Sequence, residues 1–186
     1  MTARLRESAQ ARRDVPTERQ RVQQIVLELA GRVQGRRVLD IGPEANPLAR
    51  ALAQRGAEVL VVQDPLEPVT PLRGPFDVVT AAHCIDDSAD PEATLRAAAK
   101  LLHPRGRIVI AIGHPWRSTR DGATPHPSLA TLPSLLAALR SAGLRLVDAN
   151  EPQTIPTAPD EKPEARYLVL LAERTGRRAR NRGTRG

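Results

Sequence analysis

The stretch Val38-Leu-Asp-Ile-Gly-Pro-Glu-Ala-Asn46 decides the fold of this chain. Its apolar part, which begins at Arg37 and ends at Ile41, is typical of a short buried strand, and the strand stops at a glycine. Asn46 is followed by Pro47, a favourable pair for the N-cap and first position of a helix that we expect to run through Arg55. The segment therefore predicts a strand, a tight turn and a helix in succession.

The alternation of strand and helix continues on both sides of this segment. Further strands are predicted at 57–62, 76–81, 107–112, 144–147 and 167–172. Further helices are predicted from Thr17 to a stop at Gly35, from Asp90-Pro91 to a stop at Pro104-Arg-Gly106, and at 133–142. Strands that alternate with helices across short loops indicate an α/β, doubly wound, mostly parallel sheet. No helix separates the last two strands, so we expect them to pair antiparallel at one edge.

In such a sheet, ligands bind outside the carboxyl ends of the strands, where the strand order reverses. The first strand ends at Ile41-Gly42 and the second at Gln63-Asp64. A glycine directly after a strand lets a ligand approach the backbone closely, and an acid at the end of the neighbouring strand can accept hydrogen bonds from ribose hydroxyls. These strand ends are therefore the candidate ligand contacts.

With these features the sequence resembles the class I S-adenosylmethionine-dependent methyltransferases. The stretch 38–46 is similar to the first motif of that family, and 56–64 to its second strand and ribose-binding acid. Residues 76–83 resemble its fourth strand, which approaches the transferring methyl group, and 90–110 resemble the next helix and strand. The resemblance implies a Rossmann-like methyltransferase fold, S-adenosyl-L-methionine as cofactor and methyl transfer as the reaction.

The resemblance also implies a set of cofactor contacts, namely Asp40, Ile41, Gly42, Pro43, Glu44, Asn46, Gln63, Asp64 and Ala82. For Asp40 two interpretations stay open, a cofactor contact or a structural acid that bonds the turn's own amides, because an unpaired buried carboxylate is costly. Asp64 followed by proline could be only a strand-ending turn. The family usually has further glycines at the positions of Glu44 and Asn46, so Glu44 places a side chain beside the expected methionine end of the cofactor.

Two histidines are the candidate catalytic residues. His83 follows the 76–81 strand and His114 follows the 107–112 strand. An imidazole at either place can accept a substrate proton near neutral pH, although His83 could equally be a half-buried residue that bonds a nearby carbonyl. Trp116 in the following loop could stack on a substrate or anchor the loop. The four histidines lack regular spacing, which predicts no metal site.

One part of the family pattern does not fit this chain. Only eleven residues, 65–75, separate Asp64 from Phe76, and four of them are prolines. A third strand flanked by two helices is too long for this segment, whereas an extended crossover fits. We therefore expect the third strand to be missing or reduced, the 57–62 strand to form the edge, and the wall that holds the adenine to be incomplete.

Charge is unevenly distributed along the 186 residues, whose formal net charge is +7. Residues 1–21 carry +3, residues 174–186 carry +6, and the remainder carries −2. The sequence thus predicts a flexible arm at 1–15, a methyltransferase-like domain at 16–173 and a disordered Arg-rich tail at 174–186. A core with a basic nucleic-acid-binding face is not expected, although the tail could contact RNA without specificity.

The remaining expectations concern location and activity. No apolar run is long enough to cross a bilayer, no secretory signal is visible, and the single cysteine, Cys84, excludes an internal disulfide. We expect a cytoplasmic enzyme without membrane contact that methylates an unidentified acceptor, with a small molecule or peptide favoured, and we make no prediction of oligomeric state. The alternative is a binding or accessory module that keeps the fold without methylating; a NAD-binding protein is weaker, because the turn lacks G-x-G-x-x-G.

Overall fold

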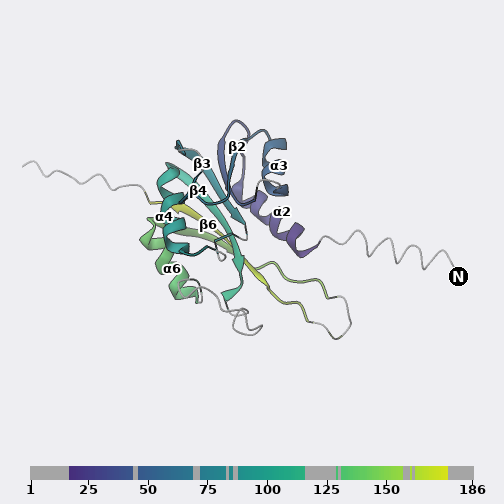
Figure 1. Cartoon of the computed structure of the whole chain (residues 1–186). Coiled ribbons are helices and arrows are strands. Elements are labelled where there is room, and N and C mark those ends of the chain that lie inside the picture. Colours follow the sequence, from purple (N-terminus) through teal and green to yellow (C-terminus); the bar gives the residue numbers. More distant parts are fainter. Residues whose placement is uncertain are drawn as a thin grey trace, which may run out of the picture.

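A six-stranded sheet forms the centre of the described residues (Figure 1). The computed structural model describes residues 17–43, 46–68, 72–82, 84–85, 88–115, 129, 131–156, 160 and 162–175. The strands are β1 (Arg37–Ile41), β2 (Glu58–Val62), β3 (Phe76–Ala82), β4 (Leu102–Gly113), β5 (Leu144–Asn150) and β6 (Tyr167–Arg174). The helices are α2 (Glu18–Ala30), α3 (Pro47–Gln54), α4 (Pro91–Leu101) and α6 (Leu132–Ser141). The predicted arm at 1–15, the predicted tail beyond 175, and the candidates Glu44, His83 and Trp116 lie outside the described residues.

The strand order is β2-β1-β3-β4-β6-β5. β1 pairs in parallel with β2 and β3, and β3 pairs in parallel with β4. β6 is antiparallel to both β4 and β5, so β5 forms the edge and β6 lies one place inside it. The predicted α/β, doubly wound and mostly parallel sheet is confirmed, and so is the antiparallel pairing of the last two strands.

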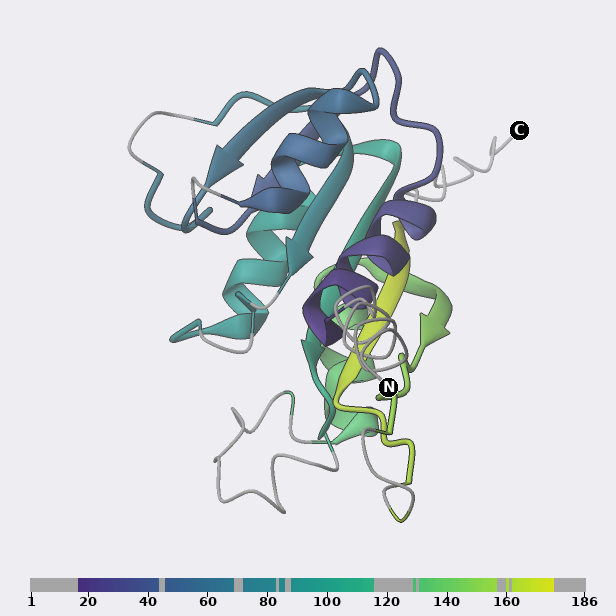
Figure 2. The same cartoon turned by 90° about the vertical axis from the view of Figure 1, so that its right-hand side faces the viewer.

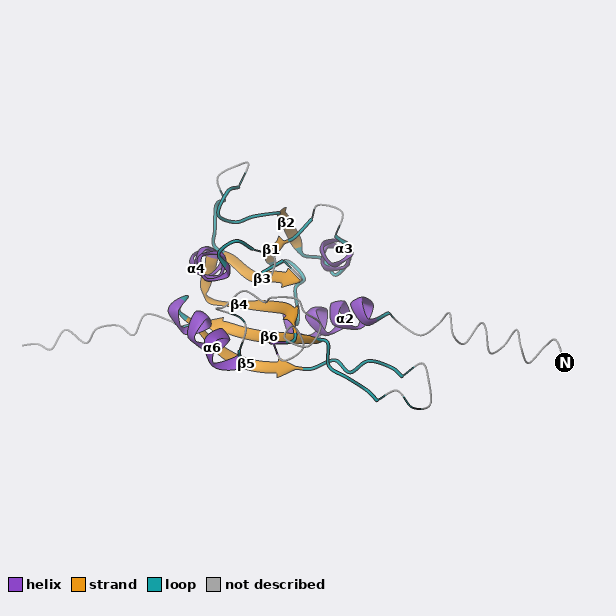
Figure 3. Ribbon diagram, turned by 60° about the horizontal axis from the view of Figure 1, so that its bottom comes forward, coloured by secondary structure: helices purple, strands orange, loops and turns teal. Residues whose placement is uncertain are grey.

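Helices cover both faces of the sheet, with α4 and α6 on one face and α2 and α3 on the other (Figure 3). Successive side chains of a strand point to opposite faces, so β1 contributes to two cores. Leu39 and Ile41 belong to the core that contains helix residues of α4 and α6. Val38 belongs to the second core, with helix residues of α2 and α3. The uninterrupted apolar character of β1 in the sequence follows from this burial on both faces.

Three of the described helices, α2, α3 and α4, begin at the predicted caps. Thr17 accepts a hydrogen bond from the Gln20 backbone while the Gln20 side chain accepts one from the Thr17 backbone, which completes a capping box. Asn46 and Asp90 cap α3 and α4 with their side-chain oxygens, each followed by a proline in the first turn. These local signals fix where each helix starts relative to the strand before it.

Several predicted boundaries are wrong, and the two largest differences are in α2 and β4. The helix α2 ends at Ala30 rather than near Gly35, because Gly31 adopts φ 70° and terminates it, and Val33 is buried in the linker beyond. The strand β4 begins at Leu102 rather than Arg107, because Leu102 already pairs with Phe76 before a shift in register. The segment 104–106 therefore lies within β4 instead of separating a helix from a strand.

The edge of the sheet next to β1 is formed by β2, as predicted from the short 65–75 segment. Within that segment, the described residues 65–68 and 72–75 contain neither helix nor strand. β2 is correspondingly open, and Leu60 on it is 42% exposed. At the other end of the chain, β6 runs to Arg174, so the predicted domain boundary at 173 falls inside a strand.

The carboxyl ends of the parallel strands lie along one edge of the sheet, here called the carboxyl edge. The N-terminal end of α2 and the connection between β5 and β6 lie at the same edge (Figure 2). Arg21 of α2 donates a hydrogen bond to the Gln153 carbonyl of that connection. A guanidinium nitrogen of Arg166 lies 3.8 Å from Glu18 Oε2 in α2. No helix in the described part of the chain is long and apolar enough to cross a membrane.

Candidate functional site

The turn after β1 is held close to the neighbouring strand. The Gly42 N–H donates to the Val62 carbonyl at 2.8 Å, which extends the pairing of β1 and β2 by one residue. A Cβ atom added at Gly42 would lie 3.1 Å from Asn46 Nδ2, tighter than an ordinary contact. A side chain at Gly42 would therefore push the Asn46 side chain away by a few tenths of an ångström, so glycine suits this closely packed turn.

Asp40 is the buried acid beneath this turn. Its side chain is fully buried, and it accepts hydrogen bonds from Thr80 Oγ1 at 2.5 Å and from Asn46 Nδ2 at 2.8 Å. Burial raises the pKa of Asp40 from 3.8 to about 6, although the hydrogen bonds from Thr80 and Asn46 act in the opposite direction. Asn46 Oδ1 meanwhile accepts from the Leu48 N–H at 2.9 Å. Asp40 thus connects β1, β3 and the start of α3.

A cavity of about 490 Å³ opens beside the turn at the carboxyl ends of β1 and β2, and we call it the β1–β2 cavity. It is lined by Ile41, Gly42, Pro43, Gln63, Asp64, Pro65, Cys84, Ser88, Ala89 and Thr94. Asp64 is exposed, and its Oδ1 accepts from the Leu66 N–H at 2.7 Å. This hydrogen bond forms the turn that ends the strand. It uses only one oxygen of the Asp64 carboxylate, which can accept several hydrogen bonds.

A second cavity of about 340 Å³ lies on the other side of the same turn, and we call it the α2–α3 cavity. It is lined by Arg19, Val22, Gln23, Pro43, Asn46, Pro47, Leu48 and Ala82. Pro43 lines both cavities, so the turn stands between them. Seven of the nine predicted cofactor contacts therefore line the two adjacent cavities, whereas Asp40 lines neither and Glu44 lies outside the described residues.

Arg19 and Gln23 were missed in the sequence. They are four residues apart, which places them on one side of α2, but nothing in the sequence indicates that this side faces the turn after β1. The only available signal is the position of α2 directly before β1. A helix that leads into the first strand can place its N-terminal end at the carboxyl edge, because it must run back along the strand direction.

His114 lies just past β4 and is only 7% exposed. Its Nε2 is 3.3 Å from Glu151 Oε1, and its backbone N–H donates to the Arg166 carbonyl at 2.9 Å. A carboxylate that bonds an imidazole fixes the orientation of the ring. Glu151 was also missed, because it follows β5, which is distant in sequence. His114 lines neither cavity, and the other candidate base, His83, lies outside the described residues.

No group of three or more His, Cys, Asp or Glu side chains that could hold a metal ion occurs among the residues that the structure describes. The chemical groups around the two cavities are instead a glycine turn, an acid, amides and an arginine. This set can bind an organic ligand that contains hydroxyl and charged groups.

Comparison with known proteins identifies the family. The sequence model of the methyltransferase domain matches residues 12–149. This chain belongs to the methyltransferase domain family. The resemblance to the methyltransferases, carried by residues 38–46, 56–64, 76–83 and 90–110, is therefore confirmed, and the match covers the β1 turn and the ends of β2, β3 and β4.

Known proteins match this methyltransferase domain at low sequence identity. The ubiquinone biosynthesis O-methyltransferase of Bordetella avium is 32% identical over 111 aligned residues, covering 46% of each chain, so this chain matches about half the length of that relative. An S-adenosylmethionine dependent methyltransferase of Mesorhizobium loti superposes with a TM-score of 0.62 at 18% identity, covering 81% of this chain and 96% of that one. The 1,6-didemethyltoxoflavin-N1-methyltransferase of Burkholderia thailandensis, solved with S-adenosylhomocysteine, superposes with a TM-score of 0.60 at 22% identity. The superposition covers 92% of this chain and 85% of that one.

Proposed function

We propose that this methyltransferase domain transfers a methyl group from S-adenosyl-L-methionine to an organic acceptor. The observation that carries the proposal is the pair of cavities on either side of Gly42 and Pro43. The β1–β2 cavity, at about 490 Å³, has the size of an ordinary ligand site. It also lies outside the carboxyl ends of parallel strands, where ligands of such sheets bind.

The residues present fit the cofactor. Asp64 and Gln63 line the β1–β2 cavity at the end of β2, where a carboxylate can accept hydrogen bonds from ribose hydroxyls. Gly42 lines the β1–β2 cavity, where the absence of a side chain would let the cofactor approach the backbone closely. Arg19 lines the α2–α3 cavity, where a guanidinium would pair with the carboxylate of the methionine end.

S-Adenosylmethionine supplies a methyl group activated by its sulfonium. The contribution of the chain is to hold an acceptor in line with that methyl group, which can account for much of the rate of a direct displacement. We further propose that the acceptor is a hydroxyl group of a small molecule, since the Bordetella relative is by name an O-methyltransferase. His114, oriented by Glu151, would then take the hydroxyl proton.

One observation favours a second candidate, a binding module that keeps the fold without methylating. β2 has no neighbour on its outer side, and Leu60 and Leu66 near the β1–β2 cavity are 42% and 43% exposed. A cofactor in that cavity would lack the covering strand that the family usually has beside the adenine. Binding of the cofactor product without any turnover would support this candidate.

Calorimetric titration of the full chain with S-adenosylhomocysteine tests the proposal. We expect saturable binding, a loss of at least tenfold in affinity for Asp64→Ala, and no change for Glu67→Ala. Glu67 is an exposed acid three residues further on that lines neither cavity, so it is the matched control. Absence of heat at millimolar ligand would overturn the proposal. Turnover is then measured as methyl transfer from labelled S-adenosylmethionine to a panel of hydroxylated aromatic compounds.

A further inference from the structure

The edge of the sheet opposite the cavities is rich in cations. The amino ends of β1 to β4, the carboxyl end of β6 and the last turns of the described helices all meet there, and we call it the amino edge. Five exposed cations at this edge have no acidic partner among the described residues: Arg32, Arg73, Lys100, Arg105 and Arg140. They come from five different segments, so the charge extends across the sheet rather than along one element.

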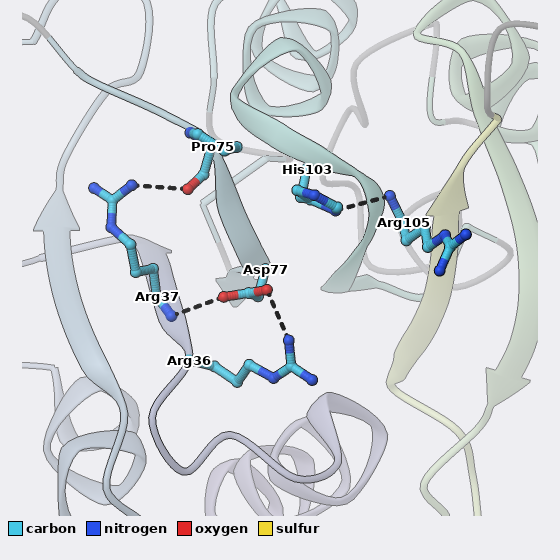
Figure 4. Close-up of polar contacts among 6 residues, drawn as sticks. All are labelled: Arg36, Arg37, Pro75, Asp77, His103 and Arg105. Carbon is cyan, nitrogen blue, oxygen red and sulfur yellow. Dashed lines mark hydrogen bonds and ion pairs between the residues drawn. The ribbon is translucent and has the colours of Figure 1, made fainter.

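Two of the acids at this edge are already neutralised. Asp77 forms an ion pair with Arg36 at 3.0 Å and accepts a second hydrogen bond from the Arg37 backbone (Figure 4). Glu173 pairs with Arg145 at 3.0 Å. Glu28 and Glu58 are the other acids near this edge in the described part of the chain, so an excess of positive charge remains.

Helix dipoles explain only part of the excess. Lys100 and Arg140 lie in the last turns of α4 and α6, where a cation is stabilised by the helix carbonyls. Arg32, Arg73 and Arg105 lie outside the helices, and their side chains form no hydrogen bond or ion pair with other described residues. Three exposed arginines on one edge without a structural partner indicate a surface that attracts anions.

The average charge of the chain conceals this arrangement. The folded middle carries −2 overall, but five of its unpaired cations lie at the amino edge, while acids such as Asp64 and Glu92 lie towards the carboxyl edge. The expectation that the core has no basic face is therefore wrong for this edge.

We propose that the amino edge binds the phosphodiester backbone of a nucleic-acid duplex without reading its bases. Six strands at the usual spacing make the edge roughly 24 Å wide, which corresponds to about seven base pairs of duplex rise. Among the described residues no exposed aromatic ring lies there, since Phe76 is buried and Tyr167 is at the carboxyl edge, so base stacking has no platform. The surface is separate from the cavities, and its function does not depend on cofactor binding.

Fluorescence anisotropy with the full chain tests this surface. The probes are labelled 16-base-pair duplexes of RNA and of DNA, titrated between 50 and 300 mM KCl. We expect both duplexes to bind, with an affinity that falls as salt rises. The variant Arg73→Ala/Arg105→Ala/Arg140→Ala should bind at least tenfold more weakly and should lower the salt slope by about 2 to 3, since each lost phosphate contact removes about 0.9.

The matched control is Arg50→Ala/Arg96→Ala/Lys162→Ala, which removes the same charge away from the amino edge. It should bind duplex within twofold of the unchanged chain, and both triple variants should keep the same affinity for S-adenosylhomocysteine and the same circular dichroism. Equal binding by the two triple variants would overturn the proposal, because binding would then belong to another part of the chain. Binding to anionic phospholipid vesicles with no duplex binding at 50 mM KCl would also overturn it, as would a tenfold preference for one duplex type.

Discussion

Replacing the buried carboxylate with an amide, Asp40→Asn, should change how stability depends on pH. Burial raises the pKa of Asp40 to about 6, from 3.8 when the chain is unfolded. The folded protein therefore holds the proton more tightly than the unfolded chain does, and stability is lost as pH rises from below 3.8 through 6. The difference in pKa between the folded and unfolded states corresponds to a loss of about 3 kcal/mol in the free energy of unfolding as the carboxyl ionises completely. About 2 kcal/mol of this loss falls between pH 4.5 and pH 7.

The asparagine variant lacks this titration but keeps the shape of the side chain. Its amide oxygen still accepts from Thr80, whereas its NH₂ group faces that of Asn46, so one buried hydrogen bond is lost at a cost of about 1–3 kcal/mol. At pH 4.5 the variant should be clearly less stable than the unchanged chain. At pH 7 the two should lie within about 2 kcal/mol, because the unchanged chain then carries a buried charge.

Urea unfolding at pH 4.5, 5.5, 6.5 and 7 measures the effect. The midpoint difference between variant and unchanged chain should shift in favour of the variant by about 1 M urea, for a slope of about 2 kcal/mol per molar. Asp64→Asn is the control, since it removes an exposed carboxylate from the neighbouring strand end, and its difference should stay constant with pH. If the difference in the free energy of unfolding between Asp40→Asn and the unchanged chain also stayed constant with pH, within about 0.5 kcal/mol, the reasoning from burial would be refuted.

Three further predictions concern the same framework. Thr80→Val removes one donor from the buried carboxylate, so it should destabilise the protein by about 1–3 kcal/mol in urea unfolding at pH 7 and by less at pH 4.5; an equal loss at both would contradict this. Gly42→Ala should change the melting temperature by no more than a few degrees but should weaken the binding of S-adenosylhomocysteine at least tenfold, as measured by calorimetry. Unchanged affinity would show that a methyl group at residue 42 does not obstruct the ligand. Arg174→Met should lower the free energy of unfolding by about 1–2 kcal/mol in urea, because the Arg174 guanidinium donates to the Leu102 carbonyl. Truncation after residue 175 should leave the free energy of unfolding unchanged. A larger loss from the truncation than from Arg174→Met would contradict this prediction.

Local signals in the sequence were sufficient for most of the fold. The caps at Thr17, Asn46 and Asp90 and the apolar runs between them specify helix starts and strands through interactions within a few residues. The short 65–75 segment was sufficient for the edge position of β2, because chain length limits what can be inserted. The errors arose where tertiary contacts override a local pattern, as in the pairing of Leu102 with Phe76 across the sheet.

The candidate site was only partly predictable, for a related reason. Gly42 and Asp64 follow from the geometry of parallel strands, whose carboxyl ends always meet. Arg19 and Glu151 reach the carboxyl edge through the packing of α2 and the position of β5, which no local spacing encodes. Asp40 illustrates the limit most clearly: its partners Thr80 and Asn46, which make it a positioning residue, come from another strand and from the start of a helix.

A crystal structure of the full chain grown with S-adenosylhomocysteine tests the central claim most directly. The account predicts a ligand across the turn at Gly42 and Pro43, with the ribose beside Asp64 in the β1–β2 cavity and the amino-acid end beside Arg19 in the α2–α3 cavity. Crystals from millimolar ligand in which both cavities hold only solvent, or in which the ligand binds elsewhere, would contradict it.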